Sequence, residues 1–231
     1  MTSTVLITGC NRGLGLEMAR QYAHEGWQVH ACARDLDSAI ELKALAQNQT
    51  SITLHQLDVA DDNQISALAS QLSGTAIDLL INNAGVYGPK GLSLDQLDRQ
   101  TWLDVLNINT VSPLMVVRAF LPNLRNGAMK KVAILSSKMG SLEDNTSGGS
   151  HIYRSGKAAV NQVVKSLSID LAGEGIQTVA LHPGWVLTDM GGPNALITAN
   201  QSVGGMRRVI ERLNDATNGK FIAYDGQIIP W

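Results

Sequence analysis

Short apolar runs alternate with longer amphipathic runs along the chain. The short runs are rich in β-branched residues and mostly unbroken in their hydrophobicity, which is typical of strands buried on both faces of a sheet. We predict strands at Val5–Thr8, Gln28–Ala33, Ile52–Leu57, Leu79–Asn82, Val132–Ser136, Gln177–His182 and Lys220–Ala223. The amphipathic runs predict helices near Leu14–Glu25, Asp37–Gln47, Asp61–Leu72, Asp95–Leu121, Tyr153–Leu171 and Ser202–Asn214.

This alternation of strands and helices indicates a parallel sheet covered by helices on both faces. Asp61 and Asp95 stand where they can act as N-cap or first-turn residues, because a carboxylate there meets free backbone N–H groups. No internal repeat, low-complexity tract or linker interrupts the pattern. We therefore predict one doubly wound α/β domain over residues 1–231, with about seven parallel strands.

The composition fits a globular protein and excludes some partners. Of 231 residues, 44% are hydrophobic and 16% charged, and the formal net charge of −2 does not favour binding to nucleic acid or to an anionic membrane. No apolar run reaches the roughly 18 residues of a membrane span, and the first residues do not resemble a signal peptide. Cys10 and Cys32 form neither a disulfide framework nor a metal-ligand pattern. We expect a cytoplasmic protein without a metal.

A glycine-rich turn, Thr8–Gly15, joins the first predicted strand to the first predicted helix. Its glycines are spaced G-x-x-x-G-x-G, so the backbone can turn sharply and approach a pyrophosphate, whose charge the helix N-terminus favours. An ordinary tight turn is the alternative, although the strand before it and the helix after it make that interpretation weaker.

The end of the second strand distinguishes NAD from NADP. An NAD enzyme usually carries Asp or Glu there, to accept hydrogen bonds from the ribose hydroxyls. This chain has Ala33 at that place and Arg34 beside it, and Arg12 in the glycine turn should face the same region. Two guanidinium groups suit a 2′-phosphate, which favours NADP(H). If the position that contacts the ribose lies one residue further along the chain, the carboxylate of Asp35 would instead meet the ribose.

Tyr153 and Lys157 are four residues apart in a predicted helix, where such a pair lies on one face. A free tyrosine has a pKa of about 10 and transfers protons poorly near neutral pH. A neighbouring ammonium, helped by the positive nicotinamide of an oxidised cofactor, lowers that pKa toward the working range. The same spacing is common in ordinary surface helices. Here it follows a strand that ends in Ser136 and Ser137, which favours a catalytic role.

The combined pattern resembles the short-chain dehydrogenase/reductase family over essentially the whole chain. The residues that carry the resemblance, in the order typical of the family, are Thr8–Gly15, Asn82–Gly85, Asn109, Ser137, Tyr153, Lys157 and His182–Gly184. Residues 136–141, 183–193 and 224–231 are similar to the subgroup that contains the C-factor proteins and the sniffer-type carbonyl reductases. The resemblance implies a Rossmann-type fold.

The resemblance also implies four catalytic residues. Tyr153 would donate a proton to a carbonyl oxygen during reduction and remove it during oxidation. Ser137 would hydrogen-bond the same oxygen and stabilise the charge that develops on it. Lys157 would also bind the nicotinamide ribose, and Asn109 would hold a water that connects Lys157 to solvent.

Two of these residues have neighbours of the same type. We prefer Ser137 because it fits the family's Ser-x-x-Gly pattern, whereas Ser136 should point to the other side of its strand. Asn107 should likewise point away from the direction of Asn109. The interval from Ser137 to Tyr153 is 16 residues, slightly longer than is usual in the family, and the additional residues can bulge at the rim of the site.

Further cofactor contacts follow from the resemblance. The full set expected to bind the dinucleotide is Gly9, Asn11, Arg12, Gly13, Leu14, Gly15, Arg34, Asp58, Val59, Asn83, Ala84, Gly85, Tyr153, Lys157, Pro183, Gly184, Val186 and Thr188. Asp58 and Val59 should meet the adenine. The nicotinamide should be surrounded by Pro183, Gly184, Val186 and Thr188. A structural role, tying the fourth strand to its neighbours, is an equally weighted alternative for Asn82–Gly85.

These observations together predict an NADP(H)-dependent oxidoreductase acting on a small aldehyde or ketone, or on the corresponding alcohol. The segment Asp189–Val203, where such enzymes carry a lid, is short and partly apolar, which favours small substrates. The apolar excess of the two longest predicted helices, together with the family's usual four-helix interface, predicts a homodimer or homotetramer. The main alternative is a cofactor-binding signalling or regulatory protein of C-factor type with incidental turnover. An epimerase or dehydratase of the extended relatives is disfavoured, because no substrate domain follows residue 231.

Overall fold

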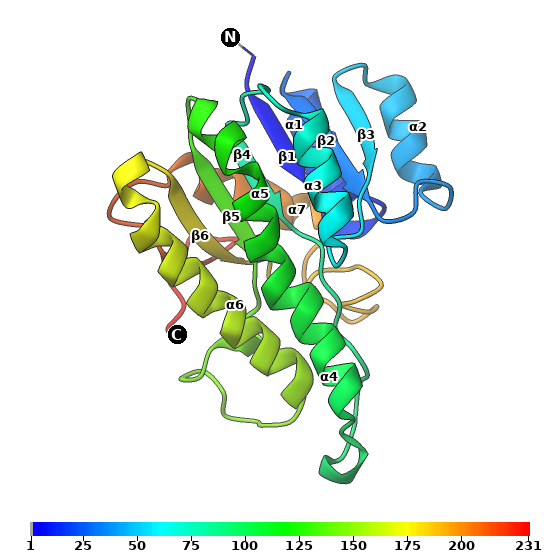
Figure 1. Cartoon of the computed structure of the whole chain (residues 1–231). Helices are drawn as coiled ribbons and strands as arrows, with labels where there is room; N and C mark the ends of the chain where they lie inside the picture. Colours follow the sequence, from blue (N-terminus) through cyan, green and yellow to red (C-terminus); the bar gives the residue numbers. More distant parts are fainter. Residues whose placement is uncertain (1) are drawn as a thin grey trace.

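The computed structural model describes residues 2–231, which form a seven-stranded parallel sheet with helices on both faces (Figure 1). The strands lie in the order β3-β2-β1-β4-β5-β6-β7 across the sheet. They are β1 (Thr4–Ile7), β2 (Gln28–Ala33), β3 (Ile52–Gln56), β4 (Leu79–Asn82), β5 (Lys131–Leu135), β6 (Gln177–His182) and β7 (Lys220–Ala223). The predicted fold class is confirmed, and each strand end lies within one residue of its predicted place.

The helices lie in two layers (Figure 1). One layer holds α1 (Gly13–His24), α2 (Ile40–Asn48) and α7 (Ala199–Glu211). The other holds α3 (Asp62–Gln71), α5 (Ser112–Asn126) and α6 (His151–Asp170), and α4 (Arg99–Leu106) leads into α5. Four short helical turns complete the order: η1 (Leu94–Gln96), η2 (Asn107–Val111), η3 (Lys138–Gly140) and η4 (Ala172–Glu174).

Alternate residues of each strand supply two hydrophobic cores, one on each face of the sheet. In β1, Val5 and Ile7 pack with residues of α1 and α7, whereas Leu6 packs with residues of α5 and α6. All three side chains are fully buried. Since burying a side chain of this size contributes about 1.5–3 kcal/mol, strands that are apolar throughout are what a sheet covered on both sides requires.

The helix starts explain one confirmed prediction and one error. Asp61 caps α3, because its side chain accepts hydrogen bonds from the backbone N–H groups of Asn63 and Gln64. Asp95 does not start the long helix; it lies in the short η1 turn. The cap of α4 is Asp98, whose carboxylate accepts from the N–H of Thr101. Asp95 is therefore a first-turn residue as predicted, but of the short η1 turn. The long helix starts later than predicted, at Arg99.

The predicted helix Asp95–Leu121 is in fact four segments, and its last segment continues beyond the expected end. A π-helical turn, η2, separates α4 from α5. Proline usually ends a helix, yet α5 continues through Pro122 to Asn126. Asn123 anchors this extension, because its buried side-chain amide donates to the carbonyl oxygens of Leu72 and Thr75.

The continuous helical run Arg99–Asn126 is long and apolar enough to cross a membrane by length and composition, which corrects the expectation that no such segment exists. Its apolar residues have another explanation. Val116, Val117, Phe120 and Leu124 are fully buried in the core beneath α5. This is the behaviour of a core helix, so the run is weak evidence for a membrane span.

Two histidines meet between strands β2 and β3. The Nδ1 atom of His30 and the Nε2 atom of His55 are 2.9 Å apart. A hydrogen bond between two imidazoles needs one donor nitrogen and one acceptor nitrogen, so at least one ring must be neutral. Burial lowers the pKa of His30 and lowers that of His55 to about 4, with a smaller contribution to the latter from His30.

This pair makes stability depend on pH. Because the pKa of His55 in the folded protein lies below its usual value of about 6.5, the unfolded chain takes up a proton first as the pH falls. We expect the free energy of unfolding to decrease from pH 6.5 to pH 4, with up to about 3 kcal/mol of that decrease due to His55. Urea unfolding at several pH values measures the slope. The variant His55→Gln should lack the His55 contribution to this decrease in unfolding free energy. The control variant His24→Gln, at an exposed position, should keep it. Equal slopes in His55→Gln and the parent would contradict the assignment.

Candidate active site

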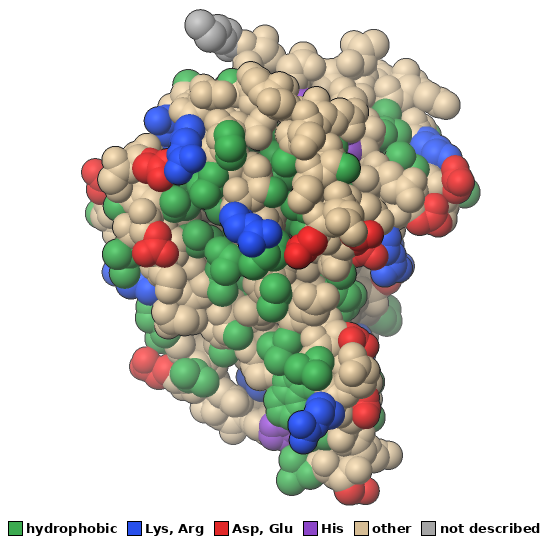
Figure 2. Space-filling model, viewed as in Figure 1, with side chains coloured by type: hydrophobic (Ala, Val, Ile, Leu, Met, Phe, Trp, Pro, Cys, Tyr) green, Lys and Arg blue, Asp and Glu red, His purple; other side chains and the backbone are tan. Residues whose placement is uncertain are grey.

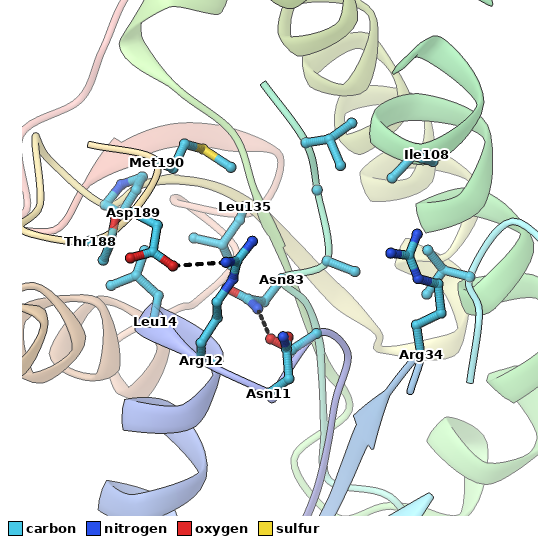
Figure 3. A pocket seen from close by; sticks show the side chains of 18 of the residues that line it. Asn11, Arg12, Leu14, Arg34, Asn83, Ile108, Leu135, Thr188, Asp189 and Met190 are labelled. Carbon is cyan, nitrogen blue, oxygen red and sulfur yellow. Dashed lines mark hydrogen bonds and ion pairs between the residues drawn. The ribbon is translucent and has the colours of Figure 1, made fainter. Parts of the chain in front are cut away.

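A cavity of about 620 Å³ opens at the carboxyl edge of the sheet, where β1 and β4 lie side by side (Figure 3). The chain leaves these two strands toward opposite edges of the sheet, and doubly wound folds bind ligands at such a point. The lining residues are Gly9, Asn11, Arg12, Gly13, Leu14, Gly15, Arg34, Asp35, Ser38, Glu41, Leu57, Asp58, Val59, Asn83, Ala84, Gly85, Val86, Ile108, Leu135, Ser136, Tyr153, Lys157, Pro183, Leu187, Thr188, Asp189 and Met190. Every residue predicted to bind the dinucleotide lines this cavity except Gly184 and Val186.

The glycine turn follows β1 along the floor of the cavity. Gly9 has a φ of +72°, a conformation that side-chain-bearing residues rarely adopt. A Cβ atom on Gly15 would lie 2.1 Å from the carbonyl oxygen of Gly9, so no side chain fits there. Asn83 locks the turn to the end of β4, since its side-chain amide donates to the carbonyl oxygens of Thr8 and Gly9 at 2.9 Å. Asn83 therefore has the structural role that was weighed as an alternative, and it lines the cavity as well.

The N-terminus of α1 faces this cavity without a side-chain cap. Arg12, the N-cap residue, has an extended backbone and makes no capping hydrogen bond. Gly13 and Leu14, the first residues of the helix, line the cavity. Uncapped backbone N–H groups at a helix start suit an anion, and the missing glycine side chains leave room for one. The residues present therefore fit a dinucleotide pyrophosphate.

The two arginines predicted to share a phosphate do not converge. The guanidinium of Arg12 pairs with the carboxylate of Asp189 at 2.8 Å. Arg34 rises from the end of β2 on the other side of the cavity (Figure 3). The sequence placed both residues correctly at the cavity, but it carried no information about Asp189, which is 177 residues after Arg12 in the chain.

The carboxylate of Asp35 is already engaged in its own turn. It accepts hydrogen bonds from the backbone N–H groups of Asp37 at 2.9 Å and Ser38 at 3.4 Å. The Ser38 side chain, followed by these backbone contacts, lowers the pKa of Asp35 below its usual value. Both of these backbone bonds are accepted by Oδ1, and Asp35 lines the cavity, so the alternative in which its carboxylate binds the ribose stays a prediction.

Tyr153 and Lys157 lie on one face of α6, and both side chains are buried. The Nζ atom of Lys157 is 5.9 Å from the centre of the Tyr153 ring and donates a hydrogen bond to the carbonyl oxygen of Leu135 at 2.8 Å. Leu135 is the last residue of β5, so this bond fixes the lysine against the end of that strand. The helix thus presents a phenol and an amine together at the cavity wall.

Burial controls the charge of this pair. It raises the pKa of Tyr153 to about 12, with a smaller contribution from Tyr87, while the adjacent Ser137 side chain opposes the rise. It lowers the pKa of Lys157 to about 8. The raised value of Tyr153 reflects burial in the protein alone; the lowering of this pKa by Lys157 together with a bound nicotinamide stays a prediction. The phenol is protonated at neutral pH and is ready to donate a proton.

The two neighbouring serines point in different directions, as predicted. Ser136 is buried, and its hydroxyl donates to the side-chain oxygen of Asn161 on α6 at 2.6 Å. Ser137 is partly exposed; its hydroxyl accepts from the N–H of Met139 and lies beside the phenol of Tyr153. The structure therefore brings Ser137, Tyr153 and Lys157 together, although Ser136, and not Ser137, is among the residues that line the cavity.

Asn109 lies in the π-helical turn η2, and Asn107 is exposed. The side chain of Asn109 is buried, and both its polar ends bind the backbone of Val86: Oδ1 accepts from the N–H at 2.9 Å and Nδ2 donates to the carbonyl at 2.7 Å. A Cβ atom on Gly85 would lie 3.1 Å from Asn109 Oδ1 and 3.6 Å from Lys157 Nζ. Asn109 thus holds the loop after β4 against the lysine. Its role in binding a water stays a prediction.

The segment after β6 contacts the cavity differently from what was expected. Gly184, with a φ of +84°, packs against Tyr224, and Val186 is buried and pairs with Ile197. The neighbours Leu187 and Met190 line the cavity instead.

Comparison with known proteins agrees with this geometry. A family model described as short chain dehydrogenase matches residues 3–196. The chain is 48% identical over 165 residues to the C-signal of Myxococcus xanthus, which covers 71% of this chain and 99% of that one. Its fold is similar to the carbonyl reductase Sniffer of D. melanogaster, with a TM-score of 0.93 and 36% identity over the whole of both chains. It is also similar to an NADPH-bound carbonyl reductase from chicken fatty liver, with a TM-score of 0.92 and 34% identity over 100% of this chain and 99% of that one. The predicted family is confirmed: the chain belongs to the short-chain dehydrogenases, a family of oxidoreductases.

Proposed function

We propose that this protein is an NADP(H)-dependent carbonyl reductase that acts on small aldehydes or ketones, and on the corresponding alcohols in the reverse direction. The observation that carries the proposal is the buried pair Tyr153 and Lys157, with Ser137 beside it, on the wall of the cavity that contains the glycine turn. A protein that only bound a dinucleotide would need the turn, but it would not need a phenol and an amine aligned at the opposite wall.

The cavity has the size and the donors for the cofactor. A volume of about 620 Å³ is within the usual range for ligand sites, about 300–1,000 Å³. The uncapped start of α1 would hold the pyrophosphate, and Lys157 would hold the nicotinamide ribose. Pro183 and Thr188 would border the nicotinamide. When bound, NADPH supplies the hydride for reduction.

The side chains of the site supply the proton and stabilise charge. Tyr153 would donate its phenolic proton to the carbonyl oxygen, which its raised pKa allows at neutral pH. The hydroxyl of Ser137 would donate a hydrogen bond to the same oxygen as negative charge develops on it. The ammonium of Lys157 would stabilise the phenolate left on Tyr153. Asn109 would keep the loop at Val86 in place behind the lysine.

The preference for NADP(H) rests on Arg34. Its exposed guanidinium lines the cavity at the end of β2, where a carboxylate would favour NAD. Asp35 lines the cavity beside it, and the N–H groups of Asp37 and Ser38 hold its Oδ1 atom. The NADPH-bound relative from chicken supports the same choice.

Small, partly apolar carbonyl compounds are the proposed substrates. Leu187 and Met190 line the cavity and are nearly half exposed, and Trp185 is exposed on the same segment. These side chains form an open apolar rim rather than a closed lid. The rim suits a small aldehyde or ketone better than one large rigid substrate.

A signalling or regulatory function with incidental turnover is the second candidate. Its support is the 48% identity to the C-signal of Myxococcus xanthus, which is higher than the identity to either carbonyl reductase reported above. NADPH oxidation measured against a panel of aldehydes, ketones and quinones separates the two candidates. No consumption with any compound would place the signalling function first.

Assembly and location are proposals of the same kind. Hydrophobic side chains gather over α5 and α6 (Figure 2), and exposed residues of the long helical run and of α6 include Val111 and Ile169. We propose that this face pairs two copies of the chain in a homodimer or homotetramer. A cytoplasmic location, with no nucleic acid or membrane partner, stays a prediction.

The first prediction concerns the proton donor. Tyr153→Phe removes the phenolic proton but keeps the ring, so the catalytic rate constant for carbonyl reduction should fall at least about a hundredfold. NADPH binding, measured by fluorescence titration, should stay nearly unchanged. Equal activity in variant and parent would remove Tyr153 from the mechanism.

The second prediction concerns pH. Lys157 is charged below its pKa of about 8 and neutral above it, whereas Tyr153 stays protonated up to about pH 12. At saturating NADPH, kcat/KM for the carbonyl compound should therefore decrease above about pH 8, as the ammonium is lost. Lys157→Met should be less active throughout and should show no decrease at this pH. A decrease that persists in Lys157→Met would assign it to another group.

The third prediction concerns the cofactor. Arg34→Asp should weaken NADPH binding by at least about tenfold and NADH binding much less, because only NADPH carries the 2′-phosphate. Fluorescence titration with both cofactors measures this. Arg12→Ala is the matched control and should change the ratio of the two affinities less, since Arg12 faces Asp189. A larger change in this affinity ratio in Arg12→Ala than in Arg34→Asp would overturn the assignment of Arg34.

A further inference from the structure

The ring of Tyr87 is stacked on the ring of the proposed proton donor, Tyr153. Tyr87 follows the loop residues Gly85 and Val86 after β4, and its ring stacks on the ring of Tyr153, with centroids 4.3 Å apart and planes inclined by 19°. The two rings come from parts of the chain 66 residues apart. A near-parallel stack restricts how the catalytic ring can tilt.

The hydroxyl of Tyr87 fixes its own position relative to the catalytic elements. It lies 3.0 Å from the hydroxyl of Ser150, the residue that precedes α6, and 3.8 Å from the sulfur of Met139. Met139 belongs to the turn that Ser137 caps. Tyr87 is therefore attached to the start of the helix that carries Tyr153 and to the turn next to Ser137.

A third contact comes from Lys90, three residues further along the same loop. The ammonium of Lys90 lies 5.1 Å from the centre of the Tyr87 ring, within the range of a cation–π interaction. The same ammonium donates a hydrogen bond to the carbonyl oxygen of Met190 at 3.0 Å. Since Met190 lines the cavity, Tyr87 is linked to the apolar rim as well as to the proton donor.

Ring orientation matters because proton transfer depends steeply on geometry. The phenolic oxygen must lie within hydrogen-bond distance of the carbonyl oxygen, and a displacement of about 1 Å can lower the rate by about a hundredfold. Lys157 is itself fixed, since its amine is bonded to the end of β5, and this amine lies 5.9 Å from the centre of the Tyr153 ring. The stack with Tyr87 fixes the plane of the ring, which no hydrogen bond to its single oxygen can do.

We propose that Tyr87 is a positioning residue: its ring holds the Tyr153 ring in the orientation from which the phenolic proton reaches the substrate carbonyl. This rests on the proposed function, in which Tyr153 is the proton donor. It differs from a packing role, because a packing residue needs only volume, whereas this role needs a flat ring. It also differs from a role in substrate binding, which would act on KM rather than on kcat.

The test compares two substitutions at one position. Tyr87→Phe keeps the ring, so its kcat for carbonyl reduction should stay within about threefold of the parent. Tyr87→Leu replaces the ring with a branched aliphatic side chain, and its kcat should fall by at least about tenfold. The dissociation constant for NADPH should stay within about twofold in both variants, because the cofactor does not depend on the stack. Equal loss of kcat in both variants, or a rise in KM at unchanged kcat in Tyr87→Leu, would overturn the proposal.

A spectroscopic readout tests the stack without relying on turnover. In protein labelled with ¹³C in its tyrosine rings, the resonance of Tyr153 is identified by its loss in Tyr153→Phe. Its ring protons should be shifted upfield in the parent and in Tyr87→Phe, and this shift should disappear in Tyr87→Leu. Ring protons of Tyr153 at unshifted positions in the parent would overturn the proposal, even if Tyr87→Leu does not fold. Tyr87→Met, with a flexible side chain that fills irregular space, is the substitute in that case.

Failure of this proposal differs from failure of the proposed function. A parent protein that reduces no carbonyl compound contradicts the function, and the spectra still decide whether the rings are stacked. An active parent whose kcat is unaffected by Tyr87→Leu contradicts the positioning role alone.

Discussion

The close packing of helix α6 against the end of strand β5 is the constraint on which the site depends. A Cβ atom on Gly140 would lie 2.6 Å from the backbone of Lys157, so this glycine lets the turn after β5 touch the helix. The amine of Lys157 reaches back to the last carbonyl of the strand, and the hydroxyl of Ser136 reaches forward to Asn161. Because these bonds join the helix to the strand end, Ser137 lies beside Tyr153 even though 16 residues separate them.

The same contact sets the electrostatics of the site. It removes water from the phenol and from the amine, which raises the pKa of Tyr153 and lowers that of Lys157. Burial therefore brings the lysine pKa close to physiological pH and leaves the tyrosine protonated. A surface pair at the same spacing would have the opposite properties, with a permanently charged lysine and a hydrated phenol. The helical spacing brings Tyr153 and Lys157 close together, and burial by the fold sets their pKa values.

Much of this could be predicted from the sequence, and the omissions have a common physical cause. Strands, the glycine turn and the Tyr153–Lys157 pair depend on local patterns, which the chain displays directly. The ion pair of Arg12 with Asp189 and the stack of Tyr87 on Tyr153 join segments that are distant along the chain, so no local pattern reveals them. The burial that raises the pKa of Tyr153 likewise depends on the whole fold, so no local pattern reveals it.

The π-helical turn η2 shows how a local irregularity can be tolerated for the sake of a site. A regular helix from α4 into α5 would have the more favourable hydrogen-bond geometry, and such turns are rare outside functional sites. The extra residue of the turn rotates every later residue by about a hundred degrees relative to a continuous α-helix. Deleting one residue between Asn107 and Val111 would therefore restore regularity while moving Asn109 off the loop that it supports. The turn therefore exchanges regular helical hydrogen bonds for the two bonds by which Asn109 holds the backbone of Val86.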